Sequence, residues 1–410
     1  MGEILFLAHR MPFPPDRGDK IRSHHILQRL AAIAPVHVAC FADDPADMAH
    51  EPSLAALAAS HCLVQRSRPL PLAGLAALVR GQPVSLTAFA ERRLASYVAG
   101  VIASRPISAI YVFSGQMGQY VPAGFAGRVV IDLVDVDSAK FGAYAAQGGL
   151  ARGWLYRREE RLLAREEARL VDRADATLLV SAEEAALLTA RLPADTRGEI
   201  YALGNGIDTA NYDPARVAPE PALTAAPGPA LIFTGQMDYP PNVTAAIRGA
   251  TRIMPRVREH FPEATFEVVG RQPTPAVRAL DGVNGCRVRG AVPDVRPWLR
   301  GADLALVPLE IARGIQNKVL EAMAMALPVV ASAGAATGIP ARDGQEIAIG
   351  ADDDALAAAA IALLADQAAA GAMGVAARQL VVRDHGWEAV LAPLPGMLGI
   401  PADGALSDAA

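Results

Sequence analysis

The chain has 410 residues, of which 52% are hydrophobic and 20% charged, with a formal net charge of -5. This length favours two domains with separate cores, and the composition is typical of a folded enzyme rather than a disordered chain. The negative charge gives no electrostatic basis for a nucleic-acid partner. Three dispersed cysteines without the spacing of a metal knuckle fit a reducing cytoplasm; they are Cys40, Cys62 and Cys286.

Short β-type runs alternate with helical patterns along almost the whole chain. Repetition of strand, helix and strand predicts parallel sheets that are covered by helices on both faces. The segment 203–230, rich in Pro and Gly, is the predicted linker. The predicted strands are 4–8, 36–41, 109–113, 129–134, 176–180, 231–234, 265–269, 304–307 and 329–331.

These patterns predict an α/β protein with two doubly wound, Rossmann-like domains that face a cleft. We place the N-terminal, acceptor-side domain at 1–205 and the C-terminal, nucleotide-sugar-binding domain at 206–385, the two roles following from the resemblance described below. For the last segment, 386–410, we consider that it packs back toward the N-terminal domain and ends in a disordered tail. Ligands of open parallel sheets bind outside the carboxyl ends of the strands, so the loops after strands are the expected functional segments.

The first such loop is HRMPFPPDRGDKIRSHH, residues 9–25. Gly18 allows a close backbone approach, and the amides at the following helix start favour an anion. Arg17 and Lys20 add positive charge. The alternative is a solvated, proline-rich turn whose charges merely flank a helix. Because no GxGxxG follows the strand, a nicotinamide or flavin domain is disfavoured.

The second loop ends an apolar strand in Asp135, Asp137 and Ser138. A carboxylate at this place can accept a proton or orient a hydroxyl nucleophile. Asp and Ser are also common helix caps. We expect one of the two aspartates to cap the helix beginning near Ser138 and the other to point into the cleft.

Neither a signal peptide nor a membrane-spanning helix is predicted. The N-terminal apolar run has no basic residue before it and reaches Pro12 too early for a secretory signal. The alanine-rich stretch after Asp354 is interrupted by Asp366, as in a soluble helix. In the helix 154–174, arginines and glutamates nearly balance, which favours a salt-bridged solvent face. We expect a cytoplasmic protein, and peripheral association with the inner face of the cytoplasmic membrane stays open.

In the second predicted domain, two strands are each followed directly by a glycine, Gly235 and Gly270. Arg271 comes next to the second of these, where it could meet a phosphate. A surface arginine is the alternative. His24, His25 and His37 have no metal-ligand spacing, so we expect no metal site.

The stretch ARGIQNKVLEAMAMALPVVAS, 312–332, joins two apolar runs. Asn317 can cap a helix in which Lys318 and Glu321 share a face. A cation at a helix N-terminus opposes the helix dipole, and a bound anion would remove that conflict. The alternative is an ordinary surface pair of Lys and Glu.

Taken together, these loops resemble the GT-B glycosyltransferases of family four, the glycosyl transferases group 1. The resemblance covers nearly the whole chain, and its most specific pieces are GNGIDTANYDP, VRGAVPDVRPWLRGADLALVPL and KVLEAMAMALPVVAS. Three further segments narrow it to the sugar transferases associated with PEP-CTERM/exosortase and exopolysaccharide gene clusters. These are FLAHRMPFPPDRGDKIRSHHILQRL, DLVDVDSAKFGAYA and GIQNKVLEAMA.

The resemblance implies a role for each matching position. Glu321 would hold the ribose hydroxyls, and Gly18 would let the backbone approach the donor phosphates. The nucleotide base would lie along Arg289, Gly290 and Val292, held mostly by backbone. The loop beside the donor sugar and phosphates would be Gly314, Ile315, Gln316 and Asn317.

This chain departs from the family pattern at two places. Arg313 stands eight residues before Glu321, where the family usually has a glutamate. Gln236 and Asn242 stand where the family has a basic pair after the first strand of the second domain. Our hypothesis is that Lys318, together with Arg271 or Arg313, supplies the missing positive charge.

The resemblance implies a retaining transfer of a sugar from a nucleotide-sugar to a glycan or lipid-linked acceptor, without a tightly bound cofactor. Asp135 or Asp137 would orient or deprotonate the acceptor, and Lys318 would stabilise the leaving diphosphate. Exopolysaccharide or cell-surface glycan biosynthesis is the implied setting. Two alternatives stay open: a nucleotide-sugar 2-epimerase of the same fold, and a non-catalytic nucleotide-sugar-binding assembly protein.

Overall fold

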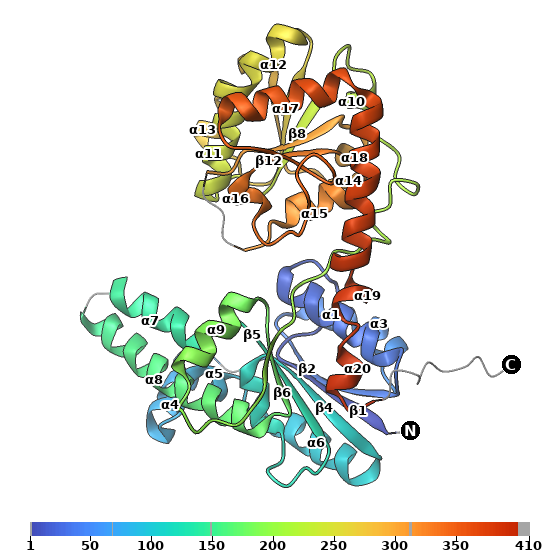
Figure 1. Ribbon diagram of the computed structural model, residues 1–410. Coiled ribbons are helices and arrows are strands. Elements are labelled where there is room, and N and C mark those ends of the chain that lie inside the picture. The colour runs from blue at the N-terminus through green and yellow to red at the C-terminus, as the bar shows by residue number, and fades with distance from the viewer. Residues whose placement is uncertain (1, 68, 148–149, 311–313, 401–410) are drawn as a thin grey trace, which may run out of the picture. The chain divides into compact units, whose positions relative to one another are not determined.

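A computed structural model describes residues 2–67, 69–147, 150–310 and 314–400 (Figure 1). The chain divides into two compact units, one of residues 1–205 with the residues from 390 onward, the other of residues 206–389. The tail considered above, 401–410, lies outside the described residues.

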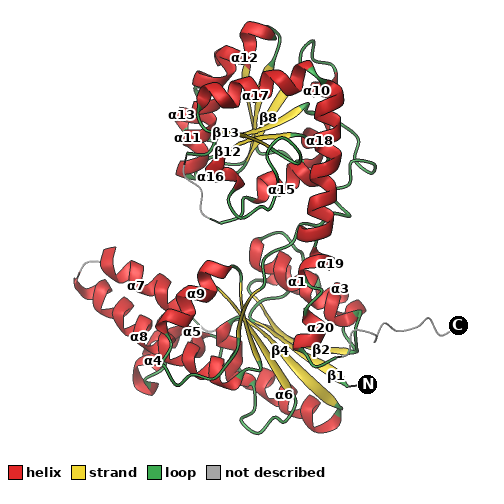
Figure 2. Ribbon diagram, viewed as in Figure 1, coloured by secondary structure: helices red, strands yellow, loops and turns green. Residues whose placement is uncertain are grey.

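The described strands of the N-terminal unit form one parallel sheet in the order β3-β2-β1-β4-β5-β6-β7. Every residue of the interior strand β1 is buried, because helices cover both faces of the sheet (Figure 2). The strands are β1 (Glu3–Ala8), β2 (Val36–Ala42), β3 (Ser60–Gln65), β4 (Ile107–Phe113), β5 (Arg128–Val134), β6 (Ala176–Leu179) and β7 (Ile200–Ala202).

The helices of this unit fill the connections between its strands. They are α1 (Gly18–Ala31), α2 (Pro45–Met48), α3 (Glu51–Leu57), α4 (Leu70–Arg80), α5 (Val84–Ala88), α6 (Arg92–Ser104), the 3-10 helix η1 (Gly115–Tyr120), α7 (Asp137–Gln147), α8 (Leu150–Arg173), α9 (Ala182–Arg191) and, near the C-terminus, α20 (Leu394–Met397).

A buried ion pair fixes α1 to the sheet of the N-terminal unit. The guanidinium of Arg22 donates to Asp132 on β5 at 2.9 Å, and the Tyr111 hydroxyl donates to the same carboxylate at 2.8 Å. Arg22 also donates to the carbonyl of Gly204 at 2.8 Å and to the Asn205 side chain at 3.1 Å. A buried charge needs such partners, so this network holds the end of the unit at residue 205 in place.

The described strands of the C-terminal unit form a second parallel sheet, in the order β10-β9-β8-β11-β12-β13. Its core lies on both faces of the sheet and includes Phe233, Phe266 and Met323. The strands are β8 (Ala230–Thr234), β9 (Thr265–Val269), β10 (Cys286–Gly290), β11 (Leu304–Val307), β12 (Val329–Ser332) and β13 (Ala348–Gly350).

Most helices of the C-terminal unit again follow strands. They are α10 (Pro221–Thr224), α11 (Pro240–Arg248), the π-helical turn η2 (Gly249–Ile253), α12 (Met254–His260), α13 (Pro275–Arg278), η3 (Val283–Gly285), α14 (Arg296–Gly301), α15 (Asn317–Ala324), α16 (Ala333–Ala336), α17 (Asp353–Ala365), α18 (Gln367–Leu380), the π-helical turn η4 (Val381–His385) and α19 (Trp387–Val390).

The predicted fold class, two doubly wound parallel α/β domains, is confirmed. Each predicted strand is present, and the structure adds four that the sequence did not predict: β3, β7, β10 and β13. These four are the edge strands of the two sheets.

Helix α8 differs from the predicted solvent face. Arg158 and Glu159 are buried, and the Arg158 guanidinium donates to Glu159 at 2.6 Å and to the carbonyl of Ala77 on α4 at 2.8 Å. Part of the charge pattern of this helix therefore serves packing inside the unit rather than contact with water.

Among the described residues, no single helix is long and apolar enough to cross a membrane. The segments 353–365 and 367–385 reach that composition only as a pair, and they are bent by 106° at the break between them.

Candidate functional site

A cavity of about 530 Å³ opens at the carboxyl ends of the strands of the C-terminal unit. The turns after β8 and β9, the segment after β10 and the first turn of α15 surround it. It is lined by Thr234, Gly235, Gln236, Tyr239, Asn242, Val269, Gly270, Arg271, Ala291, Val292, Val295, Ile315, Gln316, Asn317, Lys318 and Glu321. This is the place where an open parallel sheet binds a ligand.

Lys318 projects into this cavity from the start of α15. Its ammonium group donates to the side-chain oxygen of Asn242 on α11 and lies 4.7 Å from the ring centroid of Phe233. Burial lowers the pKa of Lys318 to about 8, and the nearby carboxylate of Glu321 acts in the opposite direction. Burial removes the water that would stabilise this ammonium charge, and an anion bound in the cavity would stabilise it instead.

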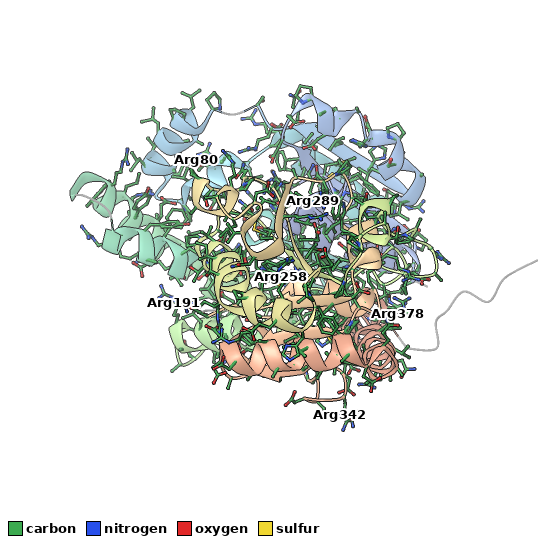
Figure 3. All side chains as sticks on the ribbon, turned by 90° about the horizontal axis from the view of Figure 1, so that it is seen from above. Arg80, Arg191, Arg258, Arg289, Arg342 and Arg378 are labelled. Atoms are coloured by element: carbon green, nitrogen blue, oxygen red, sulfur yellow. The ribbon has the colours of Figure 1, made fainter. Side chains whose placement is uncertain are left out.

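Glu321 lies one turn further along α15, at the same cavity. Burial raises the pKa of its carboxyl to about 7, while the charge of Lys318 and a hydrogen bond with Tyr212 act in the opposite direction. Sequence reasoning missed Tyr212, although this residue stands in the quoted segment GNGIDTANYDP. The backbone carbonyl of Tyr212 accepts a hydrogen bond from Arg378, labelled in Figure 3, at 2.6 Å, which fixes the segment beside α15.

Gly235 leaves room for the pair of Lys318 and Asn242. Its φ is +152°, and a Cβ atom there would lie 2.8 Å from the Asn242 amide nitrogen and 3.1 Å from the Lys318 ammonium. At Gly270, a Cβ atom would lie 1.6 Å from the carbonyl oxygen of Gly235. The two glycines that follow β8 and β9 therefore let the two turns meet at the mouth of the cavity.

Most of the predicted donor-binding residues of this unit line the same cavity. Beside Gly235, Lys318 and Glu321, they are Arg271, Val292, Ile315, Gln316 and Asn317. Gly314 is exposed in the loop before α15, with φ +62°. Arg313 lies outside the described residues, so its predicted role stays a prediction.

The expected cap of α15 differs in the structure. Asn317 is the first helical residue, the N-cap is Gln316, and no side chain caps the helix start. The Gln316 carbonyl accepts from the amides of Val319 and Leu320 at 2.9 and 3.4 Å. The Asn317 side chain is therefore not used for capping and stays at the cavity wall.

Arg289 and Gly290 stand beside the cavity rather than in its lining. Arg289 donates to the fully buried Glu267 at 2.7 Å, and its guanidinium lies 5.1 Å from the ring centroid of Trp298. The Gly290 carbonyl accepts from the amide of Gly270 at 2.8 Å. The side chain of Arg289 is thus engaged on the sheet, which leaves the backbone of this segment for any ligand contact.

In the N-terminal unit, acidic neighbours pair with the cations of the first loop. Arg17 donates to Asp19 at 2.9 Å and to Asp43 at 3.3 Å. Lys20 is buried and forms an ion pair with Asp47. Gly18 is the first residue of α1, with open space where a side chain would stand. An anion at this helix start would therefore compete with carboxylates for Arg17.

Neither Asp135 nor Asp137 makes the expected helix cap among the contacts of the described residues, and the expectation that one of them points into the cleft stays a prediction. Both accept from the ammonium of Lys140, at 2.8 and 3.3 Å. The amides at the start of α7 are bound instead by glutamates of neighbouring helices. Glu184 accepts from the Val136 amide at 2.8 Å, and Glu167 accepts from both the amide and the hydroxyl of Ser138, at 2.9 and 2.6 Å. Both aspartates are left half-exposed beside one lysine.

No group of three or more His, Cys, Asp or Glu side chains in the described part of the chain is arranged to hold a metal ion.

The two sheets and the cavity at the strand ends define the GT-B class of Rossmann-like proteins, and solved structures of that class share the fold. The chain is similar to sucrose-phosphate synthase from Thermosynechococcus elongatus, with 19% identity, a TM-score of 0.60 and coverage of 97% of this chain and 98% of that one. It is similar to HepE from Anabaena, solved with UDP and glucose, with 14% identity, a TM-score of 0.59 and coverage of 97% and 100%. It is also similar to WaaG, a glycosyltransferase involved in lipopolysaccharide biosynthesis, with 17% identity, a TM-score of 0.56 and coverage of 97% and 100%.

Residues 228–366 match the family described as Glycosyl transferases group 1. Every residue that lines the cavity lies within this range, so the match to the group 1 glycosyltransferases falls on the part of the chain that holds the candidate site. No curated protein sequence matches the chain at a significant level.

Proposed function

We propose that the protein transfers a sugar from a nucleotide-sugar to an acceptor hydroxyl, with retention of anomeric configuration. The observation that carries this proposal is the cavity of the C-terminal unit, where Lys318, Arg271 and Glu321 converge at strand ends and a helix start. The match of this unit to the group 1 glycosyltransferases supports it, as does the similarity of the fold to a protein solved with UDP and glucose.

In this proposal the donor diphosphate lies between Lys318, Arg271 and the N-terminal amides of α15. The bond between the anomeric carbon and the diphosphate oxygen breaks, the acceptor oxygen bonds to that carbon with retained configuration, and the acceptor proton goes to Asp135 or Asp137. Negative charge grows on the leaving diphosphate. A cation and oriented amides that are already in place stabilise that charge without reorganisation. Glu321, half-buried and one turn further along, accepts hydrogen bonds from the ribose hydroxyls in its ionised form.

Asp135 and Asp137 are the proposed acceptor-side carboxylates. Both are half-exposed at the end of β5, and both accept from Lys140, which holds the two carboxylates close to each other. We expect single Asp135→Asn and Asp137→Asn variants to differ in turnover, because one carboxylate is assigned to the acceptor hydroxyl. Full turnover in both variants would remove this assignment.

The setting proposed for the reaction is exopolysaccharide or other cell-surface glycan synthesis, with a glycan or lipid-linked acceptor at the inner face of the cytoplasmic membrane. The similarity of the fold to WaaG, which is involved in lipopolysaccharide biosynthesis, supports a surface glycan. The narrower association with exosortase gene clusters rests on the sequence segments quoted above.

The test is acceptor-dependent release of the nucleoside diphosphate. The purified chain is incubated with UDP-, GDP- and ADP-sugars, with and without alkyl glycosides as acceptors, and the products are analysed by NMR. We expect one donor to give diphosphate release that depends on the acceptor, with a product of unchanged anomeric configuration. Conversion of the donor without an acceptor would identify an epimerase, and saturable donor binding without any release would identify a non-catalytic binding protein.

A further inference from the structure

Helix α4 in the N-terminal unit turns its large aliphatic side chains to solvent. Leu72, Leu75, Leu78 and Val79 are between 50% and 82% exposed, whereas the buried face consists of the small side chains of Ala73 and Ala77. A surface helix normally has the reverse arrangement, with its large apolar residues toward the core. The apolar face of α4 is therefore available to something other than the protein's own core.

Three further exposed apolar side chains lie on the neighbouring helical hairpin. They are Tyr144 on α7 and Trp154 and Leu155 on α8. Helix α8 is tied to α4, because Arg158 donates to the carbonyls of Ala77 and Gln82 at 2.8 and 3.1 Å. Trp154 lies one turn before Arg158 on the same helix face. Figures 1 and 2 show α4, α7 and α8 together at one end of the N-terminal unit.

We call these seven residues the α4/α8 surface: Leu72, Leu75, Leu78, Val79, Tyr144, Trp154 and Leu155. They are half of the large hydrophobic side chains that are exposed in the described residues. Scattered exposed hydrophobic residues are normal, but a cluster on adjacent helices marks an interaction surface.

The charged residues around the α4/α8 surface are mainly basic. Arg80, labelled in Figure 3, ends α4, and Arg152, Arg157 and Arg161 are exposed on α8. The two glutamates of the same stretch of α8 are engaged: Glu159 is buried against Arg158 and the amide of Val84, and Glu160 pairs with Arg191 at 3.1 Å. Net positive charge is thus concentrated here on a chain whose overall charge is -5.

We propose that the α4/α8 surface docks on an anionic lipid bilayer. Aliphatic side chains flanked by Trp and Tyr, with arginines at the rim, match the interface between acyl chains and negatively charged headgroups. This inference rests on the membrane-side role proposed above and assigns that role to particular residues. It places the acceptor-side unit, rather than the donor cavity, against the lipid.

Vesicle flotation of the full chain tests the proposal, in the absence of any nucleotide-sugar. We expect binding to vesicles of phosphatidylcholine with phosphatidylglycerol, weaker binding to phosphatidylcholine alone, and weakening by salt. Replacing three aliphatic residues together, Leu72→Ser, Leu75→Ser and Val79→Ser, should reduce binding by at least about tenfold. The matched control replaces exposed aliphatic residues elsewhere, Leu187→Ser, Val375→Ser and Val382→Ser, and should bind as the parent does.

Tryptophan fluorescence gives a second readout at the surface itself. Anionic vesicles should shift the emission of the parent to shorter wavelength, and Trp154→Phe should abolish that shift. The proposal is overturned if the parent binds neither vesicle type, or if the triple serine variant binds as well as its control. A dimer in sedimentation that the triple serine variant abolishes would show instead that a second copy covers this surface.

Sugar transfer to a soluble alkyl glycoside separates this proposal from the proposed reaction. The triple serine variant should keep parental turnover with that acceptor while it loses vesicle binding. If the parent transfers sugar but does not bind vesicles, only the proposed docking surface is contradicted. If the parent binds vesicles but does not transfer sugar, only the proposed reaction is contradicted.

Discussion

At the scale of single residues, the decisive pair is Lys318 and Glu321. The sequence predicted a cation in conflict with a helix dipole, and the structure adds a second conflict, because burial disfavours the charged forms of both residues. Asn242 and Tyr212 offset part of that penalty with hydrogen bonds. Buried charged groups with shifted pKa values at a cavity are typical of a ligand-binding site, because they reduce the stability of the unliganded protein.

Lys318→Ala should weaken the binding of a nucleoside diphosphate by at least about tenfold, since a desolvated ion pair with phosphate contributes more than about 1.4 kcal/mol. Isothermal titration calorimetry measures the change. Arg278→Ala, which removes an exposed cation on α13 outside the cavity lining, is the control. Equal affinity of Lys318→Ala and the parent would contradict the assigned role.

Glu321→Gln should make the unliganded protein more stable at pH 8 but not near pH 4.5. The folded carboxyl has a pKa of about 7 against an ordinary value of 4.5, so the folded state keeps a proton that the unfolded state has lost. The contribution of this carboxyl to the free energy of unfolding therefore falls as pH rises from 4.5 to 7, and above pH 7 its destabilising effect is complete. The pKa of Lys318 is lowered from 10.5 to about 8, so its buried charged form destabilises the folded state below pH 8. This destabilisation disappears as pH rises toward 10.5, where the unfolded state also loses the proton.

Urea unfolding at the two pH values measures the effect of Glu321→Gln, which we expect to be on the order of 1 kcal/mol at pH 8. The exposed Glu259→Gln serves as the reference substitution, because its loss of charge involves no buried carboxyl. A gain of the same size at both pH values would mean that the raised pKa is not its source.

At the scale of elements, the interior strands could be predicted from the sequence and the edge strands could not. The interior strands β1 and β8 are buried along their whole length, and residues 4–8 and 230–233 within them are continuous apolar runs. The edge strands β7 and β10 have one paired side and mixed burial, so their sequences carry neither a continuous run nor a clean alternation. The capping of α7 could not be predicted from the local sequence either, because the acceptors of the amides at its start come from other helices, α8 and α9.

Glu167→Ala should lower the free energy of unfolding by about 1–3 kcal/mol, because it leaves the buried amide and hydroxyl of Ser138 without an acceptor. Glu166→Ala, one residue earlier on α8, removes an ion pair with the exposed Arg169 and should cost less than about 1 kcal/mol. Chemical denaturation followed by circular dichroism compares the two. Equal losses would show that Ser138 does not depend on Glu167.

At the scale of the whole molecule, the sequence predicted two parallel sheets and located much of the candidate site. Carboxyl ends of parallel strands meet at one edge, which is why Gly235, Arg271 and Lys318 could be expected to converge. Tyr212 could not be foreseen, because it reaches Glu321 from an irregular segment whose path depends on packing against Arg378. The pairing of Lys20 with Asp47 could not be foreseen either, because it joins two helices, α1 and α2, whose contact depends on tertiary packing.

Addition of a nucleoside diphosphate should raise the melting temperature of the C-terminal unit. A ligand that binds only the folded form stabilises it by about 2.7 kcal/mol at a concentration of 100 times its Kd. Differential scanning calorimetry with UDP, GDP and ADP, on the parent and on Lys318→Ala, measures the shift. No shift with any of the three would contradict binding of these nucleotides, and the same shift in the variant would place their binding away from Lys318.

The ends of the C-terminal unit lie side by side. The Ile207 amide donates to the carbonyl of His385 at 2.7 Å, and the amide of Trp387 donates back to Ile207 at 3.3 Å. Residues 206–389 thus form an inserted cassette that begins and ends at one place, within a unit that resumes at residue 390. Insertions with adjacent ends are tolerated because they leave the host chain's path unchanged. Exchange of this cassette between relatives, by recombination or by design, would replace the cavity of the C-terminal unit in one step and leave the sheet of the N-terminal unit intact.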